Sequence, residues 1–177
     1  QRVNNPDKIT FFVFKAGFNF IADRAEEKRD EAILSVNKGE AEITVFGSDE
    51  AEKASTSQVI LEGDKVKSLD DSYVTLYFYN GTKVKLDQNT TLSFTEVESS
   101  ESNDFIVLDL IEGRIWVDEV PSDEGQLELK VKPDVMNLIS FEGKYLASNI
   151  PDDEYVYVFE DRISAELVDR SAGNDVV

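Results

Sequence analysis

Apolar and polar residues alternate along residues 74–86, and an Asn-Gly pair at positions 80 and 81 interrupts the alternation. Period-two alternation on both sides of an Asn-Gly pair predicts a β-hairpin. A two-residue turn would place Lys85 beside Leu76, on the apolar side. A three-residue loop with Gly81 in the left-handed conformation instead pairs Leu76 with Val84. Burial therefore favours the three-residue loop, with the lysines facing outward.

The same alternation predicts three further hairpins, over residues 33–46, 105–120 and 155–167. In the second of these, a two-residue turn at Glu112-Gly113 would pair Leu110 with Ile115. Trp116 then falls on the face opposite to these residues. Our preferred interpretation of Trp116 is a packing anchor, and the alternative is an exposed aromatic residue that binds a partner.

The most apolar stretch of the chain is residues 9–21, which hold five of the 11 phenylalanines and a single charge, Lys15. As a strand it would be apolar on both faces, so both faces would need cover. Three interpretations remain open: a segment packed on its own domain, the stump of a membrane helix, or a strand donated to a neighbouring subunit. The candidate assembly residues are Ile9, Phe11, Phe12, Val13, Phe14, Phe18, Phe20 and Ile21.

These patterns predict an all-β protein, an antiparallel β-sandwich or partly rolled sheet of hairpins. A short helix and the apolar strand precede it. We expect an N-terminal extension over residues 1–32, in which residues 22–32 form a charged helix or linker. The β-domain is expected over residues 33–170 and a polar tail over 171–177.

The amino-acid composition excludes or disfavours several classes of function. The net charge is −19, from 37 acidic and 18 basic residues, which disfavours binding to nucleic acid. The absence of cysteine and histidine excludes thiol chemistry, imidazole catalysis and typical zinc sites. No apolar run is long enough to span a bilayer, so no direct membrane insertion of the chain is expected. We therefore expect no enzyme activity and no cofactor.

Three weaker signals concern carboxylates and asparagines. Paired acids such as Asp70-Asp71 and Asp118-Glu119 arise readily in so acidic a chain and match no catalytic motif. The run Asp152-Asp153-Glu154 makes calcium binding a minor alternative. Asn80 and Asn89 begin glycosylation sequons, although turn formation is the preferred interpretation of both sites.

An ordered series of segments extends from residue 33 to residue 170: VNKGEAEI, LEGDKV, VTLYFYNGTKVKLDQNTTL, VLDLIEGRIWVDEV, ISFEGKYLAS and EYVYVFEDRISAEL. In this order they resemble the FecR-like domain, a family of bacterial extracytoplasmic β-domains. That family usually has a glycine where this chain has Asp161. The resemblance implies an extracytoplasmic location, at the cell surface or in the periplasm.

Two functions follow from the resemblance and the apolar strand together. The best-known FecR-like proteins carry signals across the envelope and have a cytoplasmic anti-sigma segment and a membrane helix before the domain. These 177 residues contain neither. We therefore expect a non-enzymatic interaction or structural module, in its sharper form a cell-surface fibre subunit that binds copies of itself through its N-terminal strand. The alternative is the sensory domain of a trans-envelope, anti-sigma type regulator.

Overall fold

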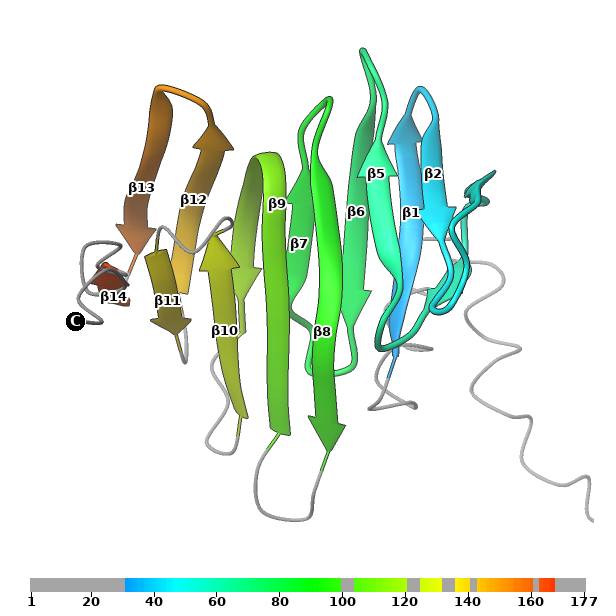
Figure 1. Ribbon diagram of the computed structural model, residues 1–177. Coiled ribbons are helices and arrows are strands. Elements are labelled where there is room, and N and C mark those ends of the chain that lie inside the picture. The colour runs from blue at the N-terminus through cyan, green and yellow to red at the C-terminus, as the bar shows by residue number, and fades with distance from the viewer. Residues whose placement is uncertain are drawn as a thin grey trace, which may run out of the picture.

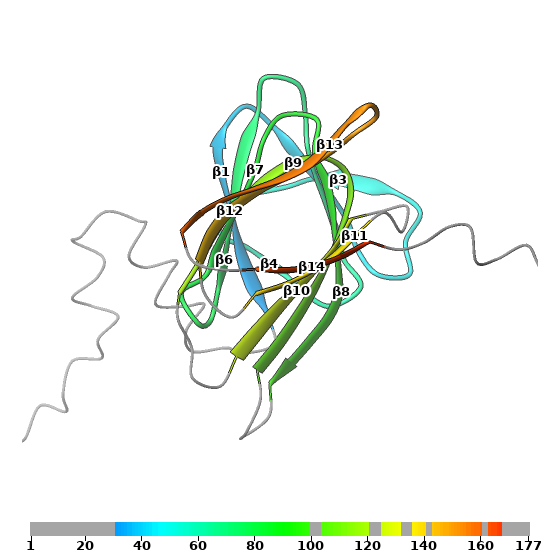
Figure 2. The same ribbon diagram turned by 90° about the vertical axis from the view of Figure 1, so that its left-hand side faces the viewer.

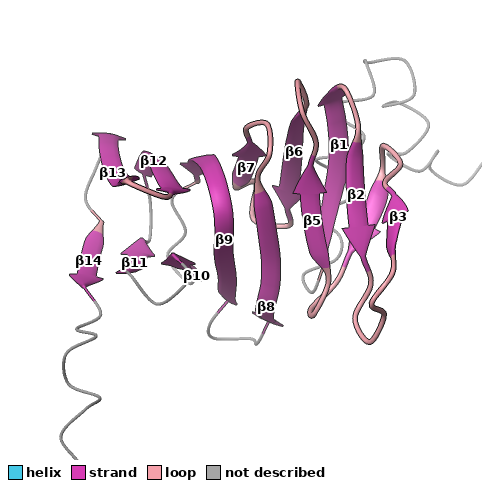
Figure 3. Cartoon of the chain, turned by 45° about the horizontal axis from the view of Figure 1, so that its top comes forward, coloured by secondary structure: helices cyan, strands magenta, loops and turns pink. Residues whose placement is uncertain are grey.

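The computed structural model describes residues 31–99, 104–120, 125–131, 136–140, 143–160 and 163–167 (Figure 1). Within these ranges the regular structure consists of strands, and no helix is present, which confirms the all-β prediction (Figure 3). The predicted apolar strand, nearly all of the charged segment after it and the C-terminal tail lie outside the described residues. The first described strand begins at Ala32, one residue before the expected domain boundary.

The strands form one strongly curled sheet whose two halves, here called sheet A and sheet B, face each other (Figure 2). The order in sheet A is β4 (Gln58–Ile60), β1 (Ala32–Lys38), β6 (Tyr73–Phe78), β7 (Lys83–Leu86), β9 (Asp104–Glu119), β12 (Gly143–Ile150) and β13 (Asp153–Glu160). The order in sheet B is β3 (Ala51–Lys53), β2 (Ala41–Thr44), β5 (Lys65–Ser68), β8 (Thr91–Ser99), β9, β10 (Gly125–Val131), β11 (Met136–Ser140) and β14 (Ser164–Leu167). Strand β9 belongs to both sheets and joins them.

The core lies between the two sheets, and most of its side chains alternate along their strands, as in β2, β7 and the first half of β12. Phe78 of sheet A stacks on Phe94 of sheet B, with ring centroids 5.7 Å apart. Tyr145 is fully buried, and Ser140 donates a hydrogen bond of 3.4 Å to its hydroxyl oxygen. Burial raises the pKa of Tyr145. Alternating inward residues thus give the continuous apolar interior that two facing sheets require.

The central hairpin, β6 and β7, has the predicted register. Leu76 pairs with Val84 and Val74 with Leu86, and these four side chains are buried. Lys85 is exposed on the other face. The loop between Phe78 and Thr82 has three residues, and Gly81 in it has φ +86°. The glycine-bulge loop is therefore confirmed.

The other three predicted hairpins are wrong. β1 and β2 lie in different sheets, β1 pairing with β4 and β6 while β2 pairs with β3 and β5. β13 pairs with β12, whereas β14 pairs with β11 in sheet B. In both cases the short connection crosses from one sheet to the other instead of folding the chain back beside itself. Alternation alone predicts a strand but does not say which strand lies next to it.

The predicted turn at Glu112-Gly113 is also absent, because β9 continues through it as one strand of 16 residues. Its first part pairs with β8 and its last part with β7 and β12. A register shift opposite Thr91-Leu92 changes which residues face inward, from Leu108 and Leu110 to Ile115 and Val117. A bulge opposite a bent strand changes which positions face inward, and a two-residue turn makes the same change. The two structures therefore give the same sequence pattern.

Candidate functional site: an open strand edge and an aromatic groove

The last strand of sheet A, β13, is open along one side. It pairs with β12 and with no other strand in the described part of the chain. The strand has eight residues, so about 26 Å of backbone, at about 3.3 Å per residue, is available for another strand. Natural β-proteins usually shorten, charge or cover such edges, because an open edge recruits other strands.

Both faces of this edge are apolar. Val156 and Val158 lie opposite the inward residues Ala147 and Tyr145 of β12, on the core side. On the outer side, Tyr157 is 59 % exposed and Phe159 is 48 % exposed. A bulge between Lys144 and Tyr145 of β12 interrupts the pairing where Phe159 lies. A strand added here would therefore meet apolar side chains on both of its faces.

The outer aromatic residues form a connected cluster. The ring of Phe159 lies 4.4 Å from that of Trp116 on β9 and 4.6 Å from that of Tyr157, measured between centroids. Trp116 thus lies on the outer face of sheet A and is only partly buried. It does not anchor the core, although it does pack against Phe159.

The predicted assembly residues between Ile9 and Ile21 all lie outside the described residues. The chain enters the described domain at β1, at the end of sheet A that lies opposite to β13 (Figure 1). Five inter-strand steps separate β1 from β13, through β6, β7, β9 and β12. At about 4.8 Å per step, the path along the curled sheet between the two positions is about 24 Å.

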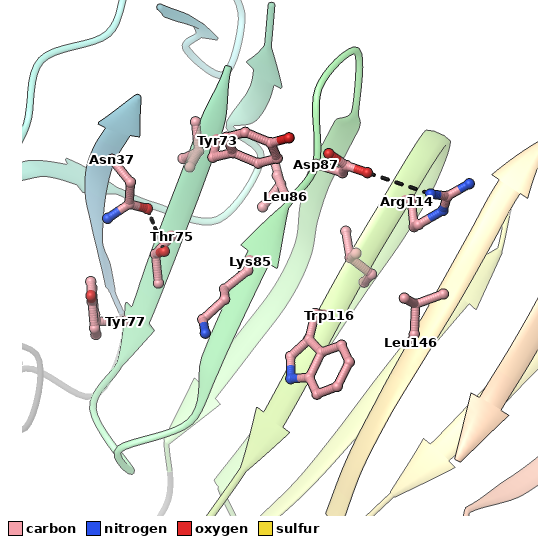
Figure 4. A pocket seen from close by; sticks show the side chains of 12 residues that line it. Asn37, Tyr73, Thr75, Tyr77, Lys85, Leu86, Asp87, Arg114, Trp116 and Leu146 are labelled. Atoms are coloured by element: carbon pink, nitrogen blue, oxygen red, sulfur yellow. Dashed lines mark hydrogen bonds and ion pairs between the residues drawn. The ribbon is translucent and has the colours of Figure 1, made fainter. Parts of the chain in front are cut away.

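A groove with a volume of about 610 Å³ runs over the outer face of sheet A (Figure 4). Five strands contribute to it: β1, β6, β7, β9 and β12. Its apolar and aromatic lining includes Tyr73, Tyr77, Trp116 and Leu146. Burial raises the pKa of Tyr77. A groove of this volume falls within the range of small-molecule sites.

Polar side chains complete the groove. Arg114 lies 3.6 Å from Asp87 and 3.6 Å from Asp153, and its guanidinium carbon is 6.0 Å from the centre of the Tyr155 ring. Thr75 donates a hydrogen bond of 2.6 Å to the side-chain oxygen of Asn37. With Lys85, the polar lining residues come from four strands and one turn and converge on one surface.

The acidic pairs of the sequence do not gather into a site. Asp71 forms an ion pair with Lys38, which raises the pKa of that lysine, and Asp153 faces Arg114. The described residues contain no group of three or more acidic side chains that could hold a metal ion. Asp152, Asp153 and Glu154 lie at an exposed turn and the adjoining start of β13.

Both sequon asparagines serve in turns. The Asn80 side chain accepts a hydrogen bond of 3.0 Å from the backbone N–H of Thr82, and Asn89 has φ +54°. These are the turn roles that the sequence predicts for asparagine. Glycosylation at either position stays a minor alternative.

The chain gave no match to family models, to curated proteins or to solved structures. The FecR-like resemblance therefore stays a prediction. In the described part of the chain, no helix has the length and apolar character needed to cross a membrane.

Proposed function

We propose that this protein is a non-enzymatic, extracytoplasmic structural module, the subunit of a cell-surface fibre. Each copy donates residues 9–21 to the open edge of β13 in the next copy. The observation that supports this proposal best is the edge itself, which is unpaired within the described residues and apolar on both faces. The extracytoplasmic location rests on the resemblance to FecR-like domains.

The donor and the acceptor edge match in pattern. Residues 9–21 carry apolar side chains at both odd and even positions. In a strand, Phe12 and Phe14 would lie on one face and Phe11 and Val13 on the other. An ordinary edge strand has one wet face and would expose half of these side chains. The β13 edge offers aromatic residues on its outer side and valines on its inner side. Side chains on both faces of the donor would therefore have apolar cross-strand neighbours on β13.

Length and charge agree with this pairing. Thirteen residues extend to about 40 Å at about 3.3 Å per residue, which exceeds the length of β13. The only charge in the donor is the cation of Lys15, whereas β13 begins with Asp153 and Glu154 and ends with Glu160. Opposite charges favour this encounter in a chain whose net charge of −19 otherwise repels its copies.

The positions of the two joints favour a fibre over a closed dimer. The described chain begins at β1, near one end of sheet A, and the acceptor edge lies at the opposite end of that sheet. An interface between two different surfaces is head-to-tail, and it propagates into an open chain unless the rotation closes a ring.

Substitution of Tyr157 by lysine is expected to weaken self-association at least about tenfold, because a charge on an edge strand opposes strand addition. Tyr73→Lys is the matched control: the same change on the same outer face, but on β6, away from the edge. Both tyrosines are roughly half exposed, 59 % and 45 %, so neither substitution removes a core residue. Sedimentation velocity at several protein concentrations measures the effect. Equal association of the two variants would contradict β13 as the joint.

A further inference from the structure

The groove on the outer face of sheet A lies beside the open edge, and Trp116 belongs both to the groove and to the aromatic cluster of β13. Tyr73, 45 % exposed, lies toward one end, and Trp116 lies toward the other, on a different strand (Figure 4). Between them, the polar groups of Asn37, Thr75 and Lys85 line the same surface. Aromatic rings separated by hydrogen-bonding groups suit a ligand that is itself apolar on its faces and polar around its rim.

The charge of the groove differs from that of the molecule. Its charged lining residues are Lys85, Arg114 and Asp87, two cations and one carboxylate, in a chain of net charge −19. Arg114 is already shared between two carboxylates, Asp87 and Asp153. The Lys85 ammonium group has no ion pair or hydrogen bond to any residue in the described ranges. One ammonium group is thus available for an anionic group on a ligand.

We infer that this groove binds an acidic sugar unit, a pyranose that carries a carboxylate, as part of an oligosaccharide. A pyranose ring offers a face of C–H bonds to the Trp116 indole. Its hydroxyls reach the exposed side-chain amide of Asn37, which Thr75 holds in place through their hydrogen bond, and its carboxylate reaches Lys85. A nucleotide would bring several negative charges to a site with one available cation. A lipid chain would leave the polar side chains of the groove without partners.

Trp116 supplies the measurement, because it is the only tryptophan in the chain. Trigalacturonic acid with two of its three carboxylates methyl-esterified keeps a single negative charge for Lys85. Added to the full chain, it is expected to change the Trp116 emission in a saturable way. The fully methyl-esterified trisaccharide has the same rings without the charge, and we expect it to bind at least about tenfold more weakly, because charge-assisted hydrogen bonds contribute more than neutral ones.

Lys85→Gln is expected to remove the preference for the acid over the ester. Lys67→Gln, the same change at an exposed position of β5 in sheet B, is expected to retain it. The inference is overturned if the acid gives no saturable response, if acid and ester bind equally, or if Lys85→Gln keeps the preference. Its failure would leave the β13 joint untouched.

Discussion

Removal of residues 1–21 is expected to convert long assemblies of this protein into monomers. The donor holds five phenylalanines, and burial of one contributes about 2 kcal/mol to the free energy of association. Burial of only four of the five would therefore contribute about 8 kcal/mol, before the cost of ordering the strand. No described strand replaces the donor on the open side of β13. Sedimentation velocity and light scattering of the full and shortened chains measure the change.

The matched control for this deletion is removal of residues 1–8 alone. These residues are polar and precede the apolar stretch, so their loss is expected to leave the assemblies intact. If the full chain and the chain without residues 1–21 are both monomers, donation between copies is wrong. Residues 9–21 would then pack on their own domain.

Substitution of Gly113 by alanine is expected to destabilise the β-domain by about 3 kcal/mol or more, in the range of severe mutations. Gly113 has φ +95°, a backbone conformation that is strained for any residue with a Cβ atom. A Cβ atom at this position would lie 2.6 Å from the Thr90 Cα and 2.8 Å from the Asn89 carbonyl oxygen. The backbone cannot move aside easily, because the Arg114 N–H donates a 3.0 Å hydrogen bond to the Thr90 hydroxyl.

Gly47→Ala separates strain from steric conflict. Gly47 has φ +81°, and a Cβ atom there would meet nothing within 4 Å. Only the conformational cost remains, about 1–2 kcal/mol. Urea denaturation of both variants gives the free energies of unfolding. Equal losses would mean that the corner around Thr90 relaxes and that Gly113 does not define the bend of β9.

The local sequence pattern predicted where strands form better than it predicted which strands pair with each other. The β6–β7 hairpin was predictable in register because its loop is short and one face carries lysines, so a slip by one residue would bury charge. The β9 bend was not, because a bulge shifts the inward residues in the same way as a two-residue turn. The parallel pairing of β9 with β10 joins residues distant in sequence, and no local pattern encodes it.

The candidate sites show the same limit. Residues 155–159 are apolar at both parities, so their sequence predicts a strand but not which of its sides lies open. The edge of β13 is open because the next strand, β14, pairs with β11 in the other sheet and not with β13. The groove draws residues from strands far apart in sequence, from Asn37 to Leu146, and therefore appears only in the folded domain.

Chemical cross-linking between two differently substituted chains tests the proposed joint most directly. The chain has no cysteine, so single cysteines placed by substitution are unique. One chain carries Thr10→Cys in the donor, and the other carries Glu154→Cys or Glu160→Cys, near the two ends of β13, so that either strand direction is sampled. Lys67→Cys on β5 is the control acceptor.

After mixing with a short bismaleimide, we expect covalent dimers that contain one chain of each kind, with a β13 cysteine and not with the Lys67→Cys control. Only contacts between copies can give this product, because each chain holds a single cysteine. The absence of mixed dimers would contradict strand donation, above all if a chain with both Thr10→Cys and a β13 cysteine cross-links within itself.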